Sequence, residues 1–270
     1  MTSDDQTYPF DNAREVQRER LRALEVVLVT GTTAALEARG VQRGWRCLEV
    51  GGGGGSIATW LCSRVAPEGH VTATDLDTTV LRELSHPNLE VRVHDVLHDD
   101  LPEREFDLIH LRLVLAWLVE PSRALRRLVS ALKPGGWLVA EEMDFVSVVA
   151  DPRMDTESAA LFARLIDAHT LVLAERNAFD ATYGRRLFGD VEDVGLVDVG
   201  SQGRAAMWRG GEAGGRAWKL TLTQLREPLV ASGRVTAPEV DLGIALCDDP
   251  ELSFMSQLTV AAWGRRPPDA

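Results

Sequence analysis

Residues 47–56 read Cys-Leu-Glu-Val-Gly-Gly-Gly-Gly-Gly-Ser, and an amphipathic segment begins directly after them at Ile57. An apolar run with one acid, then five glycines and a helical pattern, predicts a strand, a tight loop and a helix. Glycines lack a Cβ atom, so the loop backbone can bend sharply and approach a ligand closely. The helix that follows presents unpaired N–H groups toward whatever lies over the loop. We therefore expect this loop to hold a nucleoside-bearing cofactor.

The composition of the 270-residue chain argues against several classes of function. Its formal net charge of −12 disfavours binding to nucleic acid and to anionic membranes, because both depend on Lys and Arg. Three cysteines without paired spacing (Cys47, Cys62 and Cys247) indicate a reducing compartment and no metal site. The sequence has no signal-peptide pattern and no membrane-span pattern, so we expect a cytoplasmic protein. Only Lys133 and Lys219 are lysines among 29 basic residues, which is typical of a high-GC bacterial genome.

Predicted strands and helices alternate in the first half of the chain. A helical pattern begins at Ala13, breaks at residues 31–33 and resumes until Gly40, and we expect helices after most strands. The predicted strands are residues 46–50, 71–74, 89–93, 106–111 and 137–142. Such alternation predicts a parallel sheet with helices on both faces, where ligands bind beyond the carboxyl ends of the strands. Five polar residues fall at such ends: Glu49, Asp75, Asp95, His110 and Glu142.

The alternation ends after residue 144. The remaining pattern predicts helices at residues 155–176, 184–194 and 211–248, and strands at 195–199 and 258–263. The predicted fold class is α/β, with a doubly wound, mostly parallel seven-stranded sheet and a helical cover. We divide the chain into an N-terminal arm and capping helices (1–40), a cofactor-binding core (41–144), a helical lid and substrate region with one strand (145–248), and a final strand and tail (249–270).

Two common nucleotide-binding patterns do not fit the first glycines of the loop. From Gly51 or Gly52, the dinucleotide pattern Gly-x-Gly-x-x-Gly/Ala would need glycine or alanine where Ser56 or Ile57 stands, and a phosphate-binding P-loop needs a lysine that is absent. The pattern that does fit is Glu-x-Gly-x-Gly-x-Gly at residues 49–55.

Four motifs in order resemble the class I S-adenosylmethionine-dependent methyltransferases. They are the acidic glycine motif at 49–55, Asp75 after the second strand, Asp95-Val96 after the third, and Leu-Lys-Pro-Gly-Gly at 132–136 before the fifth. Within that class the chain is similar to the small-molecule branch of the ubiquinone/menaquinone-biosynthesis methyltransferases and their bacterial natural-product relatives. The resemblance covers about residues 13–144 and the final strand. It implies a Rossmann-like methyltransferase fold, S-adenosylmethionine as cofactor and S-adenosylhomocysteine as product.

The resemblance also implies which residues bind the cofactor. Glu49 and the loop backbone would hold the methionine part, and Asp75 would accept hydrogen bonds from both ribose hydroxyls, a task suited to a carboxylate. Leu76 and Val96 would sandwich the adenine, and Asp95 would accept from its amine or else serve as a turn residue. The full set is Glu49, Gly51, Gly52, Gly53, Asp75, Leu76, Asp95, Val96 and His110.

Methyl transfer is an in-line displacement, in which the protein contributes alignment, exclusion of water and, where needed, removal of a proton. Two residues are catalytic candidates. His110 could take a proton, or could only pack near the methionine part. Glu141 and Glu142 are consecutive in a strand and face opposite sides. We choose Glu142, because related enzymes place an acid there, as a general base or as an anchor for a cationic substrate.

Residues that could line the acceptor site lie on several predicted elements. They are Tyr8, Arg112, Trp117, Asp144, Phe145, His169 and Tyr183. Each could instead serve only packing or the surface, and His169 in particular lies on an apolar helical face. Many relatives carry His-His where this chain has Ala116-Trp117, so a histidine base of those relatives is missing or moved here. Trp117 indicates a flat apolar or aromatic substrate, or contact with a cation.

These observations predict an enzyme that methylates N, O or C of a small aromatic or heteroaromatic specialised metabolite, in bacterial natural product biosynthesis. One alternative is a quinone-type C-methyltransferase of core metabolism. Another, from a different class, is a non-catalytic S-adenosylmethionine-binding regulatory protein. We expect a monomer or homodimer with no metal and no nucleic-acid or membrane partner.

Overall fold

The computed structural model describes residue 10, residues 15–176 and residues 179–269. These residues form two compact units, and each is described by itself. The sheet unit comprises residues 28–143, 183–203 and 259–269. The helical unit comprises the described parts of residues 1–27, 144–182 and 204–258.

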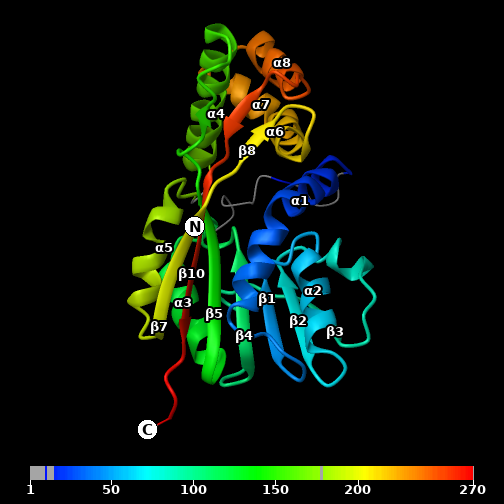
Figure 1. Ribbon diagram of the computed structural model, residues 1–270, viewed down its shortest axis with the longest axis vertical. Coiled ribbons are helices and arrows are strands. Elements are labelled where there is room, and N and C mark those ends of the chain that lie inside the picture. The colour runs from blue at the N-terminus through cyan, green and yellow to red at the C-terminus, as the bar shows by residue number, and fades with distance from the viewer. Residues whose placement is uncertain (1–9, 11–14, 177–178, 270) are drawn as a thin grey trace, which may run out of the picture. The chain divides into compact units, whose positions relative to one another are not determined.

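The sheet unit is built on seven strands. They are β1 (Arg46–Val50), β2 (His70–Asp75), β3 (Leu89–Val93), β4 (Phe106–Arg112), β5 (Leu132–Asp144), β7 (Val197–Arg204) and β10 (Leu258–Arg265). Their order is β3-β2-β1-β4-β5-β10-β7, so that β3 and β7 form the two edges (Figure 1). The ladders β1–β2, β2–β3, β1–β4 and β4–β5 are all parallel. The predicted seven-stranded, mostly parallel α/β sheet is therefore confirmed.

The helices of the first half pack against this sheet. They are α1 (Glu15–Glu37), of which residues 15–27 count with the helical unit, α2 (Ser56–Val65) and α3 (Pro121–Ala131), and α5 (Tyr183–Glu192) follows later. Leu36 of α1 and Ile57 and Leu61 of α2 form one buried cluster with Cys47 of β1 and Leu108 of β4. Burying one such side chain stabilises the fold by about 1.5–3 kcal/mol. This apolar layer therefore fixes both helices against the strands that lead to the glycine loop.

The predicted break at residues 31–33 is wrong, because α1 runs through them without interruption. Leu28 and Leu36 are both buried on one face of α1, and Thr32 between them is also buried. Gly31 destabilises the interior of this helix by about 1 kcal/mol, but burial of the apolar face of α1 stabilises it by more.

Two other expected helices are only single turns. The segment after β2 forms the 3₁₀ turn η1 (Leu81–Glu83), and the segment after β4 forms η2 (Leu115–Trp117). Pro87 follows η1 closely, and the residue before a proline disfavours the helical conformation. Leu113, directly after β4, has φ of 58° in the left-handed region, so a helix cannot continue from the strand there.

The helical unit contains four helices and a small sheet among the described residues. The helices are α4 (Thr156–Arg176), α6 (Ala213–Gln224), α7 (Arg226–Ala231) and α8 (Ala237–Leu246). The strands β6 (Val149–Ala150), β9 (Ser253–Met255) and β8 (Met207–Arg209) pair in that order as an antiparallel sheet. Aromatic rings form its core, with the Phe162 and Phe254 centroids 4.7 Å apart and those of Trp208 and Phe254 5.9 Å apart.

The expectation of a single strand within residues 145–248 is wrong, because β6, β7 and β8 all lie there. β6 and β8 have two and three residues, which is too short to show an alternating pattern in the sequence. α5 and most of β7 also count with the sheet unit rather than with the predicted lid region. None of the described helices is long and apolar enough to span a membrane.

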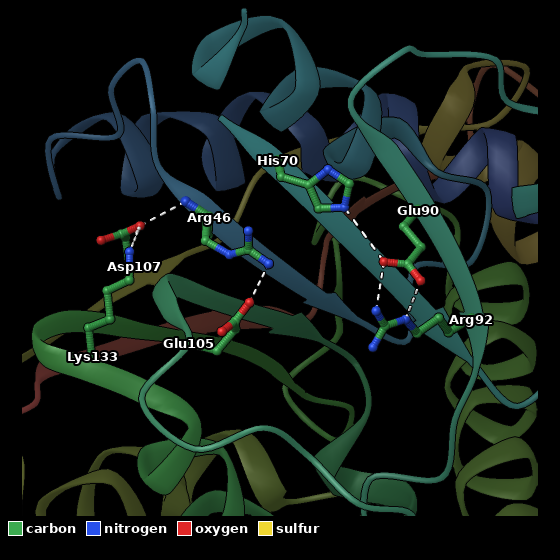
Figure 2. Close-up of polar contacts among 7 residues, drawn as sticks. All are labelled: Arg46, His70, Glu90, Arg92, Glu105, Asp107 and Lys133. Carbon is green, nitrogen blue, oxygen red and sulfur yellow. Dashed lines mark hydrogen bonds and ion pairs between the residues drawn. The ribbon is translucent and has the colours of Figure 1, made fainter. Parts of the chain in front are cut away.

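Charged side chains join the amino ends of the strands (Figure 2). Asp107 of β4 accepts two hydrogen bonds of 2.7 Å, one from the backbone N–H of Arg46 and one from Lys133 Nζ. The Arg46 side chain also forms an ion pair with Glu105. On β3, Arg92 pairs with Glu90 in a more exposed setting. Asp107 therefore ties together three strands that are distant in sequence.

We expect Asp107→Ala to lower the free energy of unfolding by about 1 kcal/mol, because it removes an acceptor shared by β1 and β5. Glu90→Ala is the matched control, since its exposed pair with Arg92 contributes at most about 0.5 kcal/mol. Urea unfolding of both variants measures the difference. Equal stability of the two variants would show that Asp107 does not join the strands energetically.

Candidate functional site

The glycine loop after β1 has a backbone that other residues cannot adopt easily. Gly51 and Gly55 have φ of 66° and 86°, in the left-handed region. A Cβ atom on Gly51 would lie 2.4 Å from Val114 Cγ2, and one on Gly55 would lie 2.4 Å from Leu84 Cδ1. Gly55 is the N-cap residue of α2, and Ser56 is the first residue of that helix. The predicted strand, tight loop and helix are confirmed.

Asp75, at the carboxyl end of β2, forms a hydrogen bond with the backbone of the glycine loop. Its Oδ2 atom accepts a hydrogen bond of 3.1 Å from the Gly53 N–H, and its Oδ1 atom accepts one of 3.2 Å from the Asp77 N–H. The Gly52 N–H also donates to the Thr74 carbonyl at 3.0 Å. Burial raises the pKa of Asp75, and the backbone hydrogen bonds oppose that rise. The structure therefore brings this predicted residue to the predicted loop.

The end of β3 lies next to Asp75, since the His94 N–H donates to the Asp75 carbonyl at 3.0 Å. Asp95 accepts hydrogen bonds from the Leu97 N–H at 2.8 Å and from His98 Nδ1 at 2.9 Å. Burial raises the pKa of Asp95, but these two hydrogen bonds outweigh it and hold the pKa below its usual value. Asp95 thus serves a turn and stays ionised, while its role toward the adenine remains a prediction.

Of the two apolar residues predicted to sandwich the adenine, Leu76 directly follows β2, and Val96 follows Asp95 in the turn after β3. Leu76 is 66% exposed, whereas Val96 is buried. An exposed leucine at the carboxyl edge of a sheet is available for contact with a ligand.

A buried ion cluster lies beneath the loop. His110 of β4 is 0% exposed, and its Nδ1 atom lies 2.7 Å from Glu49 Oε2 on the neighbouring strand β1. Its Nε2 atom lies 3.5 Å from Oε2 of Glu141 on β5, an ion-pair distance that is too long for a strong hydrogen bond. Register explains part of this arrangement, because Glu49 and His110 are direct cross-strand partners.

Two further residues complete this cluster. Thr32 of α1 donates a hydrogen bond to Glu141, and Arg112 Nη1 donates to Thr32 Oγ1 at 2.9 Å. We call Thr32, Glu49, His110, Arg112 and Glu141 the buried ion cluster. Its two carboxylates are balanced by one imidazolium and one guanidinium, as buried charges require.

The expectation that His110 takes a proton from the substrate does not fit this geometry. Burial alone would lower the pKa of His110, but the charges of Glu49 and Glu141 and the hydrogen bond to Glu49 outweigh it and raise the pKa to about 9. The imidazole therefore already carries its proton at neutral pH, and both ring nitrogens face carboxylates. The structure gives His110 a structural role in the buried ion cluster.

Glu142, the second catalytic candidate, faces away from Glu141 as expected for consecutive strand residues. Its Oε1 atom accepts hydrogen bonds from the N–H groups of Val114 at 2.9 Å and Leu115 at 2.6 Å, at the start of η2. Oε2 is buried and has no hydrogen-bond partner among the described residues. Burial raises the pKa of Glu142 to about 8, although the backbone donors oppose this. Glu142 thus positions the segment that also packs on Gly51, which differs from the base or anchor we expected.

The predicted substrate residues of the sheet unit have partners inside the protein. Arg112 belongs to the buried ion cluster, and the Tyr183 hydroxyl donates to Asp190 Oδ2 at 2.7 Å. Burial, followed by Asp190, raises the pKa of Tyr183. Trp117 lies in η2 and is partly exposed. Tyr8 lies outside the described residues.

The other predicted substrate residues belong to the helical unit. Asp144 is buried and begins a turn, in which the Ser147 hydroxyl donates a hydrogen bond of 2.7 Å to the backbone carbonyl of Asp144. The Phe145 ring contacts His169, with centroids 6.4 Å apart, and Phe179 at 5.0 Å. The structure therefore brings Phe145 and His169 together within one aromatic cluster.

Several residues that contact the predicted ones were not foreseen. The contact between Glu141 and Thr32 can be inferred from strand and helix periodicity only once α1 is known to pack over this face of the sheet. Trp218, whose ring lies 5.1 Å from that of His169, has no signal in the sequence that separates it from other buried tryptophans. In the ranges that the structure covers, no group of His, Cys, Asp and Glu could hold a metal ion.

Variants of Glu142 test its positioning role. Because its pKa in the fold, about 8, exceeds the usual 4.5, folding takes up a proton, and stability falls as the pH rises from about 4.5 to about 8. Glu142→Gln keeps an acceptor oxygen but does not titrate, so its unfolding free energy should vary less over this range. Glu142→Ala should lose about 1–3 kcal/mol at every pH, because buried N–H groups lose their acceptor. Identical pH profiles for wild type and Glu142→Gln in urea unfolding would contradict this account.

Comparison with known proteins shows which family the middle of the chain is similar to. Residues 48–140 match the family described as "Methyltransferase domain". The chain is 33% identical over 101 residues to methyltransferase str2 of Strobilurus tenacellus, covering 37% of this chain and 36% of that protein. It is 27% identical over 152 residues to the ubiquinone/menaquinone biosynthesis C-methyltransferase UbiE of Vibrio vulnificus, covering 53% of this chain and 58% of that protein. The chain thus spans about a third to three fifths of the length of these relatives.

Solved structures agree on the fold. A phosphoethanolamine N-methyltransferase of Haemonchus contortus, in complex with phosphomonomethylethanolamine and S-adenosylhomocysteine, superposes with a TM-score of 0.56 at 15% identity, over 97% of this chain and 61% of that one. The YcgJ protein of Bacillus subtilis gives a TM-score of 0.55 at 12% identity, over 88% and 98%. Residues 48–140 match the methyltransferase domain family, and in its motifs and fold the chain resembles the class I S-adenosylmethionine-dependent methyltransferases, including the UbiE proteins.

Proposed function

We propose that this protein transfers a methyl group from S-adenosylmethionine to N, O or C of a small aromatic or heteroaromatic metabolite. The observation that carries the proposal is the joint position of the glycine loop and Asp75, linked by the 3.1 Å hydrogen bond from Gly53. In the matched family, this edge of the sheet is where the cofactor binds. Matches to methyltransferases of several substrate classes support the reaction more than any one acceptor.

The residues of this edge fit the parts of S-adenosylmethionine. Asp75 uses its oxygens only on backbone N–H groups, so each retains a lone pair for a ribose hydroxyl. A side chain at Gly51 would collide with Val114, so only glycine allows the loop backbone to lie in this place. Leu76 and Val96 supply apolar contacts for the adenine. The bound cofactor supplies the electrophilic methyl group, and the protein supplies alignment and exclusion of water.

The buried ion cluster limits how the acceptor loses its proton. His110 is held as an imidazolium, and burial raises the pKa of Glu142 to about 8 so that it already carries a proton at neutral pH, and in this proposal neither accepts one. In this proposal the acceptor therefore has a nucleophile that ionises readily or carries a free lone pair. A phenol, an enolisable carbon or a neutral amine meets that requirement. Glu49, already bonded to His110, supports the loop rather than the acceptor.

A second candidate is a quinone-type C-methyltransferase of core metabolism. The similarity to UbiE proteins over 152 residues favours it. Quinone precursors are themselves phenols, so both candidates share the same chemistry at the nucleophile. Release of labelled methyl groups into a small molecule would separate either candidate from a non-catalytic regulatory protein.

We expect Asp75→Ala to weaken S-adenosylmethionine binding by about 1.5–3 kcal/mol, roughly 10- to 150-fold, because a charged acceptor of two hydroxyls is lost. Isothermal titration calorimetry measures the affinity. Asp77→Ala is the matched control, since Asp77 bonds Thr79 two residues away and should leave the affinity unchanged. Unchanged affinity in Asp75→Ala, or binding of NAD in place of S-adenosylmethionine, would contradict the proposal.

A further inference from the structure

Two buried aromatic side chains of the helical unit carry polar atoms without partners. His169 on α4 is 3% exposed and Trp218 on α6 is 4% exposed. In the part of the chain that the structure describes, neither His169 Nδ1 nor Trp218 Nε1 has a hydrogen-bond partner. Buried polar groups are nearly always paired, and each unpaired one costs about 1–3 kcal/mol. Two such atoms on rings in contact indicate that a partner from outside the chain belongs there.

The rings of His169 and Trp218 contact each other edge to face. Their centroids are 5.1 Å apart, at an interplanar angle of 73°. Further rings lie around them, since Phe145 is 6.4 Å from His169 and Phe162 is 6.2 Å from Trp218, measured between centroids. Phe145 is only partly buried. Flat apolar walls around a polar pair suit a planar aromatic molecule with one polar group.

The chemistry of the pair selects that polar group. Burial, followed by the positive charge of Arg20, lowers the pKa of His169 to about 3, so the imidazole is neutral. Arg20 itself is held by a hydrogen bond of 2.9 Å to Thr221 Oγ1 and lies over the Phe10 ring at 3.8 Å. A neutral imidazole can accept at Nδ1, whereas an indole N–H only donates. A hydroxyl satisfies both at once, because it accepts from Trp218 and donates to His169.

We propose that His169 and Trp218 form a recognition site for the hydroxyl of an aromatic, phenol-type methyl acceptor. This inference rests on the proposed function for the identity of the ligand as the acceptor. The site itself lies wholly within the helical unit, and no comparison with known proteins assigns it. It narrows the proposed acceptor from any aromatic or heteroaromatic metabolite to one whose planar ring carries a hydroxyl group.

Matched probes test the site in the full-length chain. Equilibrium dialysis with 2-naphthol and naphthalene measures how much the hydroxyl group alone contributes to the binding affinity. Wild type should bind 2-naphthol at least about ten-fold more tightly, which corresponds to about 1.4 kcal/mol. His169→Phe and Trp218→Phe should each abolish this preference. Trp208→Phe, in the same aromatic cluster but without an unpaired buried atom, should retain it.

Unfolding in urea excludes a purely structural role for these atoms. Unfolding in urea should show that His169→Phe and Trp218→Phe are no less stable than Trp208→Phe, because they remove unpaired polar atoms. A larger loss of stability in the two variants would indicate a structural role for these atoms instead. If wild type binds the two probes equally, or binds neither, the two polar atoms bind only an ordered water. Either result would overturn the proposed recognition site.

Calorimetry with S-adenosylmethionine separates this inference from the proposed function. If the cofactor binds but the hydroxyl preference is absent, the site fails and the proposed function stands. If the preference is present but the cofactor does not bind, the proposed function fails and a phenol-binding site stands without its assigned role. Both variants at His169 and Trp218 should bind the cofactor as wild type does.

Discussion

The arrangement of the strands that lead into the glycine loop depends on the contact between His110 and Glu49. Both side chains are buried, and charges in a protein interior are tolerated only when they are paired. Glu141 and the Thr32–Arg112 pair extend this contact from β1 across β4 and β5 to α1. The strand that enters the glycine loop is therefore fixed by electrostatics as well as by its ladder hydrogen bonds.

This arrangement separates binding from proton transfer. A histidine held between two carboxylates keeps its proton, and a glutamate bonded to backbone N–H groups positions that segment, so we propose that His110 and Glu142 shape the site rather than react. Asp75 remains the carboxylate best placed for the cofactor, because only backbone N–H groups occupy it. Recognition of the acceptor then falls to other parts of the chain, of which the pair His169 and Trp218 in the helical unit is our specific proposal.

The sheet and its ligand-binding edge could be predicted because buried parallel strands read as apolar runs that end in polar residues. The same pattern placed Glu49, Asp75 and Asp95 correctly at that edge. It could not predict the neighbours of His110, because Glu141 on β5 is held by Thr32 of a helix that we expected to break at residues 31–33. Strands of two or three residues, such as β6 and β8, carry no periodic signal, and the pairing of Trp218 with His169 depends on tertiary packing alone.

The protonation state of His110 tests the central claim most directly. It can be measured by nuclear magnetic resonance of protein labelled with ¹⁵N in its histidines, with His110→Gln used to assign the signal. The account predicts that both ring nitrogens carry protons at pH 7 and that the ring titrates only near its pKa of about 9. Since that value lies above the usual 6.5, the stability from this cluster is present below about pH 6.5 and is lost as the pH rises through about 9. A neutral His110 at pH 7, titrating near or below 6.5, would contradict the account.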